Sequence, residues 1–320
     1  MNSNREALRD VIDAEARAPA SAPVMALTGE IRKRHGDAVA AVLFYGSCLR
    51  GAPEQPDGDE GVFDLYVLVD RYRDVYAARS MAIANALLPP NVFYIEVPWE
   101  ERCLRAKYAI ISLAQFHRGT SRRSFHSSLW ARFAQPARLV YARDTVCHTA
   151  AIAALCDAVT TMAVRIAPLL GEEFGAAELW RRGFQETYRA ELRAEGPSRA
   201  RQLYESDAER YDRVTPMALR AAGLTSEETP QEGRFRVATS AFRRYRARAL
   251  WALRRWIGKT LTVLRLIKGA FTFDGAVDYI LWKIERHSGV RATLTGWQRR
   301  HPILASPAVA WRLYRQGALH

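Results

Sequence analysis

The stretch VAAVLFYGSCLRGAPEQPDGDEGVFDLYVLVD, residues 39–70, contains two apolar runs separated by a polar loop. The runs, residues 42–45 and 62–69, are rich in valine, leucine and aromatic residues, which favour β-strands. The loop begins with Gly46-Ser47 and continues with proline, glycine and acidic residues, as is typical of mobile surface loops that carry function. We therefore expect a strand, a loop and a second strand, around which the rest of the chain is arranged.

The residues at the two ends of this loop predict a phosphate and metal site. Gly46 has no side chain to obstruct a phosphate, and Ser47 adds a hydroxyl donor beside backbone N–H groups. A helix beginning near Cys48 would add the positive end of its dipole. Asp64 begins the second run, where its carboxylate can bind a divalent cation that neutralises a nucleoside triphosphate. A hairpin with a small-residue turn would also contain a Gly-Ser pair, so the pair alone does not decide the question.

A second metal ligand is harder to assign. In a D-x-D arrangement it would be residue 66, which is Tyr66, a poor Mg²⁺ ligand at neutral pH. Asp70 lies six strand residues beyond Asp64, or about 20 Å. One alternative is that Asp64 alone binds the metal together with the triphosphate. The other candidates are acids from a neighbouring strand or from the loop: Glu96, Asp57, Asp59 and Glu60.

The order of the elements predicts an α+β protein. Helical patterns cover 4–16, 25–35 and 71–88, and strand patterns cover 92–97, 107–113 and 137–142. Helical patterns then follow at 150–170, 176–194 and 200–211. We expect a small mixed β-sheet domain over 1–145, a helical domain over 146–240 and a basic amphipathic segment over 241–320. The apolar stretch 149–170 contains Asp157, Arg165 and Pro168, which favours a buried helix over a membrane span.

The charge of the chain predicts a polyanionic partner. It has 47 basic and 34 acidic residues, a net charge of +13 and a pI near 9.9. Between residues 233 and 273 there is no acid, and apolar residues recur among arginines at helical spacing. Such a helix packs against its own protein, lies in an anionic membrane interface, or binds single-stranded nucleic acid. The residues expected to contact lipid are Arg254, Arg255, Trp256, Lys268 and Phe271.

The cysteines and the first residues of the chain indicate a compartment. The four cysteines are scattered, with no C-x-x-C pair, so we predict neither a zinc site nor a disulfide framework. The first 23 residues mix acids and bases without an apolar core, and we expect no secretory signal. The predicted location is the cytoplasm.

Six short motifs occur in an order that resembles a known family. They are FYGS (44–47), FDLYVLVD (63–70), NVFY (91–94), KYAIIS (107–112), YRAELR (188–193) and LIKGAF (266–271). Together they resemble the mitochondrial translocator-assembly-and-maintenance type of phosphatidate cytidylyltransferase and its bacterial relatives. The resemblance implies a nucleotidyltransferase domain, a winged-helix-like domain and a C-terminal membrane-binding segment.

The activity implied by the resemblance is synthesis of CDP-diacylglycerol and pyrophosphate from CTP and phosphatidate with Mg²⁺, on the inner face of the cell membrane. It implies that Gly46, Ser47, Lys107 and Arg193 bind the phosphates of CTP, and that Asp64 and Lys107 are catalytic. Glu191 stands where the family usually has aspartate, and Ala190 where it usually has glycine.

Two other classes of function fit the same sequence. One is a nucleotidyltransferase acting on RNA or a small molecule, with the basic segment as an RNA clamp. The other is a non-catalytic membrane-bound adaptor of the same fold, which Tyr66 at the D-x-D position favours. The lipid enzyme requires no nucleic acid, and the sequence leaves base selectivity, acyl-chain selectivity and oligomeric state open.

Overall fold

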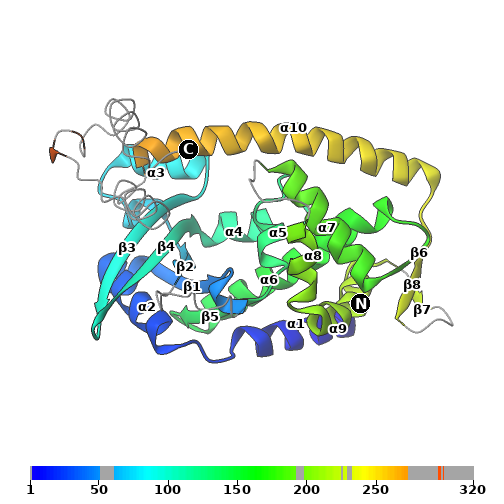
Figure 1. The fold of residues 1–320 in the computed structure, drawn as a ribbon, viewed down its shortest axis with the longest axis horizontal. Coiled ribbons are helices and arrows are strands. Elements are labelled where there is room, and N and C mark those ends of the chain that lie inside the picture. The colour runs from blue at the N-terminus through cyan, green and yellow to red at the C-terminus, as the bar shows by residue number, and fades with distance from the viewer. Residues whose placement is uncertain are drawn as a thin grey trace.

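The computed structural model describes residues 2–50, 61–191, 198–224, 226–228 and 233–272, together with 295, 296 and 298. The protein is α+β, as the sequence predicts, with a five-stranded mixed sheet and a larger helical part (Figure 1). The strands are β1 (Val39–Tyr45), β2 (Phe63–Val69), β3 (Asn91–Trp99), β4 (Arg102–Ser112) and β5 (Ala137–Ala142). Their order is β3-β4-β2-β1-β5, in which β2 and β4 are parallel and the other neighbours antiparallel.

The strand register gathers polar residues into one row across the sheet. Tyr45 of β1 pairs with Asp64 of β2, Asp64 pairs with Lys107 of β4, and Lys107 pairs with Tyr94 of β3. Residues paired directly across neighbouring strands project from the same face of the sheet. The row therefore presents an acid, a lysine and two tyrosines on one face, at the end of β1 and the beginning of β2.

The two faces of the sheet are covered differently. Helices α2 (Ala22–His35) and α3 (Arg79–Leu87) lie on one face, over a core that includes Val42, Leu65 and Ile110. The other face, which carries Tyr66 and Leu43, is continuous with the core of the helical part. The Asp64 row belongs to this second face, because Asp64 and Tyr66 are two residues apart on β2.

The helical part packs around one long central helix, α6 (Thr145–Ile166). The surrounding helices are α1 (Asn2–Ala16), α4 (Leu113–Thr120), α5 (Trp130–Phe133), α7 (Ala176–Ala190) and α9 (Ala208–Ala221), while α8 (Ser198–Glu205) packs on α7 and α9. Short 3₁₀ turns are η1 (Gly36–Ala38), η2 (Cys48–Arg50), η3 (Tyr72–Asp74) and η4 (Ala167–Leu169). Although α1 opens the chain, its Leu8 and Ile12 belong to the same core as α6 and α9.

Helix α6 with η4 is the stretch among the described residues that is long and apolar enough to cross a bilayer. Its most apolar window is 67% buried inside the protein. This is the packing expected of the core helix that the sequence predicts.

Two predicted helices were wrong in extent. The pattern at 200–211 is split into α8 and α9 at Ser206-Asp207, where the Ser206 hydroxyl bonds the Leu203 carbonyl and Asp207 leaves helical geometry. The pattern at 71–88 contains η3 and then α3. Tyr76 stacks on Tyr72 and on Phe93 of the sheet, so tertiary packing replaces the first turns of the expected helix.

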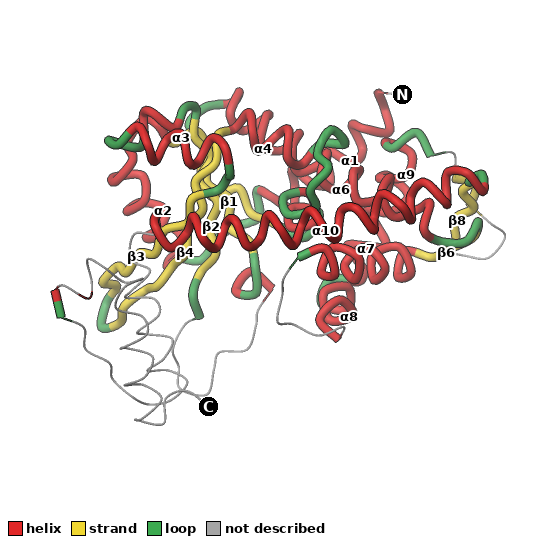
Figure 2. Tube along the Cα trace, turned by 90° about the horizontal axis from the view of Figure 1, so that it is seen from above, coloured by secondary structure: helices red, strands yellow, loops and turns green. Residues whose placement is uncertain are grey.

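One helix connects the two ends of the protein. A small sheet with order β6-β8-β7 is formed by β6 (Glu173–Gly175), β7 (Ser226–Glu228) and β8 (Arg234–Val237). It leads into α10 (Ala241–Thr272), which runs along the helical part to the β3 side of the large sheet (Figures 1 and 2). Residues 241–272 thus form the basic amphipathic helix that the sequence predicts, as a single helix.

Candidate functional site

The end of β1 and the beginning of β2 bring Gly46 directly against Asp64. Gly46 has φ +96°, a conformation that other residues rarely adopt. A Cβ atom placed on Gly46 would lie 2.7 Å from Oδ2 of Asp64, too close for a real contact. Glycine is therefore required here for two independent reasons, and it leaves the carboxylate facing the turn that carries Ser47.

The turn after Gly46 is not the helix considered from the sequence. Residues Cys48–Arg50 form a single 3₁₀ turn, in which the Arg50 N–H donates to the Ser47 carbonyl at 3.0 Å. Three residues have too small a dipole to attract an anion strongly. A helix dipole therefore adds little to the attraction of phosphate, and the long-range part of that attraction comes from side-chain charges.

Those charges surround Asp64. Burial raises the pKa of the Asp64 carboxyl above its ordinary value, while the charges of Lys107, Arg132 and Arg50 act to lower it. Lys107 is the paired residue on β4, and Arg50 is held by a bond of 3.1 Å from its Nη1 to Oε1 of Gln135. One carboxylate thus lies within a group of three cations, an excess of positive charge that suits a polyphosphate.

Arg132 of α5 occupies the space beside the would-be second ligand position. Its Nη1 donates to the hydroxyl of Tyr66 at 3.1 Å, and its guanidinium lies 5.7 Å from the Tyr66 ring and 5.4 Å from the Tyr45 ring. Tyr66 is buried against Phe133 and Phe116. In place of a second carboxylate, the structure has a phenol and a cation.

The end of α7 and the far half of α10 complete this side of the site. The charge of Glu191, the residue after α7, acts on both Arg132 and Arg265 of α10. Arg265 also donates from Nε to the Pro89 carbonyl at 3.1 Å, at the start of β3. The two helices meet so closely that a Cβ on Gly258 would overlap the carbonyl oxygen of Ala190.

The donor set allows only a restricted magnesium site. Among the described residues, no group of three or more His, Cys, Asp or Glu side chains lies together. Mg²⁺ often keeps several waters and binds one or two carboxylates plus substrate phosphates. The site therefore fits an ion carried by a triphosphate, with Asp64 as its protein carboxylate, and does not fit a cage built by the protein alone.

Glu96, predicted as a second ligand, lies elsewhere on the sheet. It is exposed, accepts from the Tyr94 hydroxyl at 2.8 Å and pairs with Arg105 at 3.3 Å. Two strand spacings and two residues along the strand separate it from Asp64, about 12 Å. The structure therefore does not bring Glu96 to Asp64. Arg193 and the loop acids 57, 59 and 60 lie outside the described residues.

The cations predicted to contact lipid are mostly used within the protein. Arg254 is 1% exposed and donates from Nε to the Phe125 carbonyl at 2.7 Å. Arg255 pairs at 2.9 Å with the buried Glu186 of α7. Lys268 is half-buried and donates to the Pro90 carbonyl at 2.7 Å, and burial lowers its pKa to about 8.

The predicted apolar contacts divide differently. Trp256 is 69% exposed on α10, as a lipid contact requires. Phe271 lies within α10, but its side chain is outside the described residues.

Sequence reasoning missed two cations near Asp64, Arg50 and Arg132, and also Arg265, which interacts electrostatically with Tyr66 and Glu191. The α5 stretch has no motif of its own, and Arg265 lies 201 positions from Asp64 along the printed sequence. The usable signal was Tyr66: a buried phenol on the same face as an acid needs a polar partner.

No protein-family model matches the chain, and no curated protein matches it.

Proposed function

We propose that this protein is a Mg²⁺-dependent nucleotidyltransferase, and specifically a phosphatidate cytidylyltransferase that makes CDP-diacylglycerol from CTP and phosphatidate at a membrane surface. The observation that carries nucleotide transfer is the contact between Gly46 and Asp64, with Lys107 paired to Asp64 on the next strand. It is the arrangement needed to hold an anion at a turn beside one metal-binding carboxylate.

The residues of the site have separate tasks in this proposal. Ser47 and the backbone after Gly46 hold the β- and γ-phosphates, while Lys107 and Arg50 balance charge that develops on the leaving pyrophosphate. Arg132 adds a fixed positive charge near Asp64 that can pair with phosphate oxygens of the nucleotide. Mg²⁺ bound with the triphosphate would neutralise its oxygens, with Asp64 as protein ligand.

The acceptor needs little activation from the protein. A phosphate monoester has a second pKa near 6, so it is already largely dianionic at neutral pH. Its oxygen attacks the α-phosphorus of CTP, a new P–O–P bond forms, and the bond to pyrophosphate breaks. No general base is required, in keeping with the absence of histidine from the motifs.

Support for a lipid acceptor comes from the surface of α10. Large apolar side chains along it are exposed by 43–73%: Phe242, Tyr245, Leu253, Trp256, Val263, Leu264, Leu266 and Ile267. From first to last they extend about 38 Å at 1.5 Å per residue. Exposed apolar and aromatic residues among arginines suit the interface of an anionic membrane.

The same helix connects this surface to the site. Arg265, which interacts electrostatically with Tyr66 and Glu191, lies between the exposed Leu264 and Leu266. A membrane under this part of α10 would therefore adjoin the nucleotide site, which is the geometry that a lipid phosphate needs.

The proposal is tested by offering the full-length protein labelled CTP and Mg²⁺ with three acceptors separately: phosphatidate in phosphatidylcholine vesicles, glycerol 3-phosphate, and RNA. We expect label in lipid alone. If RNA or glycerol 3-phosphate is labelled and no lipid product forms, the labelled molecule is the acceptor and phosphatidate is not. No turnover with any acceptor would indicate a non-catalytic protein.

A further inference from the structure

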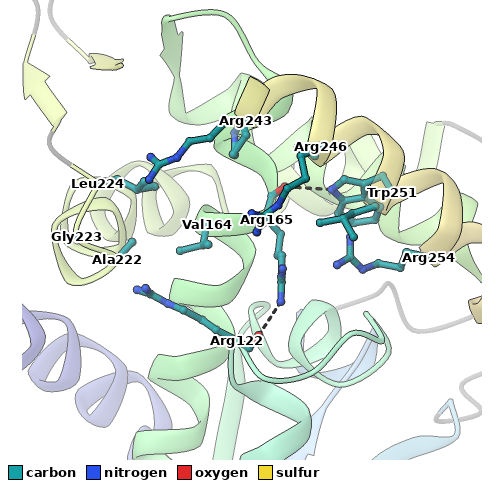
Figure 3. A pocket seen from close by; sticks show the side chains of 13 residues that line it. Arg122, Val164, Arg165, Ala222, Gly223, Leu224, Arg243, Arg246, Trp251 and Arg254 are labelled. Atoms are coloured by element: carbon teal, nitrogen blue, oxygen red, sulfur yellow. Dashed lines mark hydrogen bonds between the residues drawn. The ribbon is translucent and has the colours of Figure 1, made fainter. Parts of the chain in front are cut away.

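A pocket lined by arginines lies away from Asp64, between α6, the end of α9 and the first half of α10 (Figure 3). Its volume is about 360 Å³. Five of its lining residues are arginines and none is acidic: Arg122, Arg165, Arg243, Arg246 and Arg254. These residues come from three separate parts of the chain, so the clustering arises from the fold and was not visible as a motif.

Two of the arginines are held rigidly in the wall. The Arg254 side chain lies over the rings of Trp251 and Phe125, at 4.5 and 4.7 Å from their centroids. Arg165 donates from Nη2 to the Arg122 carbonyl at 2.6 Å, and its own carbonyl accepts from the Trp251 indole at 3.1 Å. Their guanidinium groups are therefore already in place before any ligand arrives, which lowers the entropy cost of binding.

The hydrogen bonds of these two side chains are incomplete. Nη2 of Arg254 and Nε of Arg165 are buried, and neither has a partner among the described residues. A buried donor without an acceptor costs free energy, more so when it is charged. Each of these arginines therefore retains a donor for which the described chain supplies no acceptor.

The charges of the cluster also oppose one another. Burial, and then the charge of Arg165, lower the pKa of Arg254 to about 10. Burial and then the charge of Arg246 lower the pKa of Arg165 in the same way. In the described chain no salt bridge joins the five arginines to an acid, although the charge of Asp157 partly offsets that of Arg122. A bound anion would relieve this repulsion between the arginines.

We propose that this pocket binds a phosphate group, supplied either by free phosphate or by the headgroup of a phosphate monoester lipid. Guanidinium groups bind phosphate oxygens in pairs, and a tetrahedral anion offers acceptors to several arginines at once. The volume lies at the small end of ligand sites and suits a single headgroup.

The pocket is separate from the nucleotide site, so this inference does not depend on the proposed activity. Arg254 and Arg265 are on the same helix, about 16 Å apart along its axis, and Arg243 and Arg246 lie still further from Arg265. Arg243 and Arg246 are exposed on the α10 side of the pocket, where a ligand can enter.

The first test maps arginine reactivity in the full-length protein. Phenylglyoxal modification is followed by peptide mass spectrometry, with inorganic phosphate or with chloride at equal ionic strength. We expect phosphate to protect Arg243 and Arg246, while Arg248, exposed on the same helix but outside the pocket lining, reacts equally in both. Equal reactivity of all three arginines in phosphate and chloride would overturn the proposal.

The second test measures binding with the double variant Arg243→Gln, Arg246→Gln, whose changes are at exposed positions, beside Arg248→Gln as control. We expect the double variant to weaken phosphate binding at the protected site at least about tenfold, as loss of charged hydrogen bonds predicts. An unchanged affinity would contradict the assignment of the pocket.

Vesicles distinguish the two sources of the phosphate. If the ligand is a lipid headgroup, the double variant loses binding to phosphatidate-containing vesicles but keeps binding to phosphatidylserine vesicles of equal charge. If the ligand is free phosphate, both vesicle types behave as with the parent protein and only phosphate binding falls. Either result supports a phosphate site. If the double variant keeps both its phosphate binding and its binding to phosphatidate vesicles, the proposal is overturned.

Discussion

Gly46 and Asp64 are in contact at the junction of β1 and β2, and a methyl group on Gly46 would lie 2.7 Å from the Asp64 carboxylate oxygen. The close approach and the φ of +96° make the position intolerant of any side chain. Most of the proposed chemistry depends on this contact, because it leaves the carboxylate open to the turn that would hold the phosphates.

Replacing Gly46 by alanine should therefore damage the site. We expect Gly46→Ala to lower nucleotide transfer at least about 100-fold by displacing Asp64. The strained backbone should also lower the free energy of unfolding by about 1–3 kcal/mol. Gly29→Ala in α2 is the matched control, since a Cβ there has no atom within 4 Å. Helix propensity predicts that Gly29→Ala is neutral or stabilising by up to about 1 kcal/mol. Activity assays and urea unfolding of both variants check this, and full activity of Gly46→Ala would contradict it.

Asp64 should reduce stability at neutral pH. Burial raises its folded-state pKa above the ordinary 3.8, so the folded protein disfavours the charged form. Asp64 therefore contributes to the stability of the fold when it is protonated. This contribution is fully present at a pH below the ordinary pKa, and it is lost as the pH rises through the raised folded-state pKa. Asp64→Asn has no such charge, and we expect it to melt at a higher temperature than the parent at neutral pH. The difference should vanish in acid.

Thermal unfolding across pH tests the sign of this difference in melting temperature, with Asp10→Asn on the exposed side of α1 as control. A lower melting temperature for Asp64→Asn than for the parent at neutral pH would refute the prediction.

The contact between α7 and α10 should depend on Gly258. A Cβ at this position would overlap the Ala190 carbonyl, so Gly258→Ala must push the helices apart, at a cost of about 1–3 kcal/mol. Gly269→Ala, in the same helix and with no atom within 4 Å of its Cβ, should be neutral or slightly stabilising. Denaturant unfolding of the two variants compares them directly. Equal stabilities would mean that α10 does not dock as described.

Membrane binding should depend on the exposed stripe of α10. We expect Trp256→Ser to weaken co-sedimentation with anionic vesicles at least about tenfold, because a large aromatic side chain no longer inserts. Binding by the parent should persist at high salt, whereas a purely electrostatic attachment would be lost steeply. Val146→Ser, at a residue 76% exposed on α6, controls for loss of an exposed apolar side chain. Equal vesicle binding by the two variants would argue against α10 as the membrane face.

The sequence was sufficient where local pattern determines structure. The apolar runs around Gly46-Ser47 predicted β1 and β2, and ARLVYA predicted β5 (Ala137–Ala142) to the residue. The basic amphipathic pattern predicted α10. The sequence was insufficient where segments that are distant along the chain meet in the fold. Nothing local shows that Arg132 contacts Tyr66, because only the packing of α5 on the sheet brings them together.

The same limit applies to the lipid-contact residues. Hydrophobic spacing places Trp256 and Arg254 on one helix, but it does not reveal which side of that helix meets the protein. The structure buries Arg254 against Trp251 and Phe125 and exposes Trp256. A charge run in sequence cannot separate arginines that hold a helix in place from arginines that face a ligand.

The most direct test of the account compares two carboxylates on the same sheet face. Formation of CDP-lipid from labelled CTP and phosphatidate is measured for the parent, Asp64→Asn and Glu96→Gln. We predict robust product from the parent, a loss of at least about 100-fold in Asp64→Asn, which lacks the carboxylate proposed to bind the metal, and near-parental activity in Glu96→Gln, which is paired with Arg105. Parental activity in Asp64→Asn, or no CDP-lipid from the parent, would contradict the central claim.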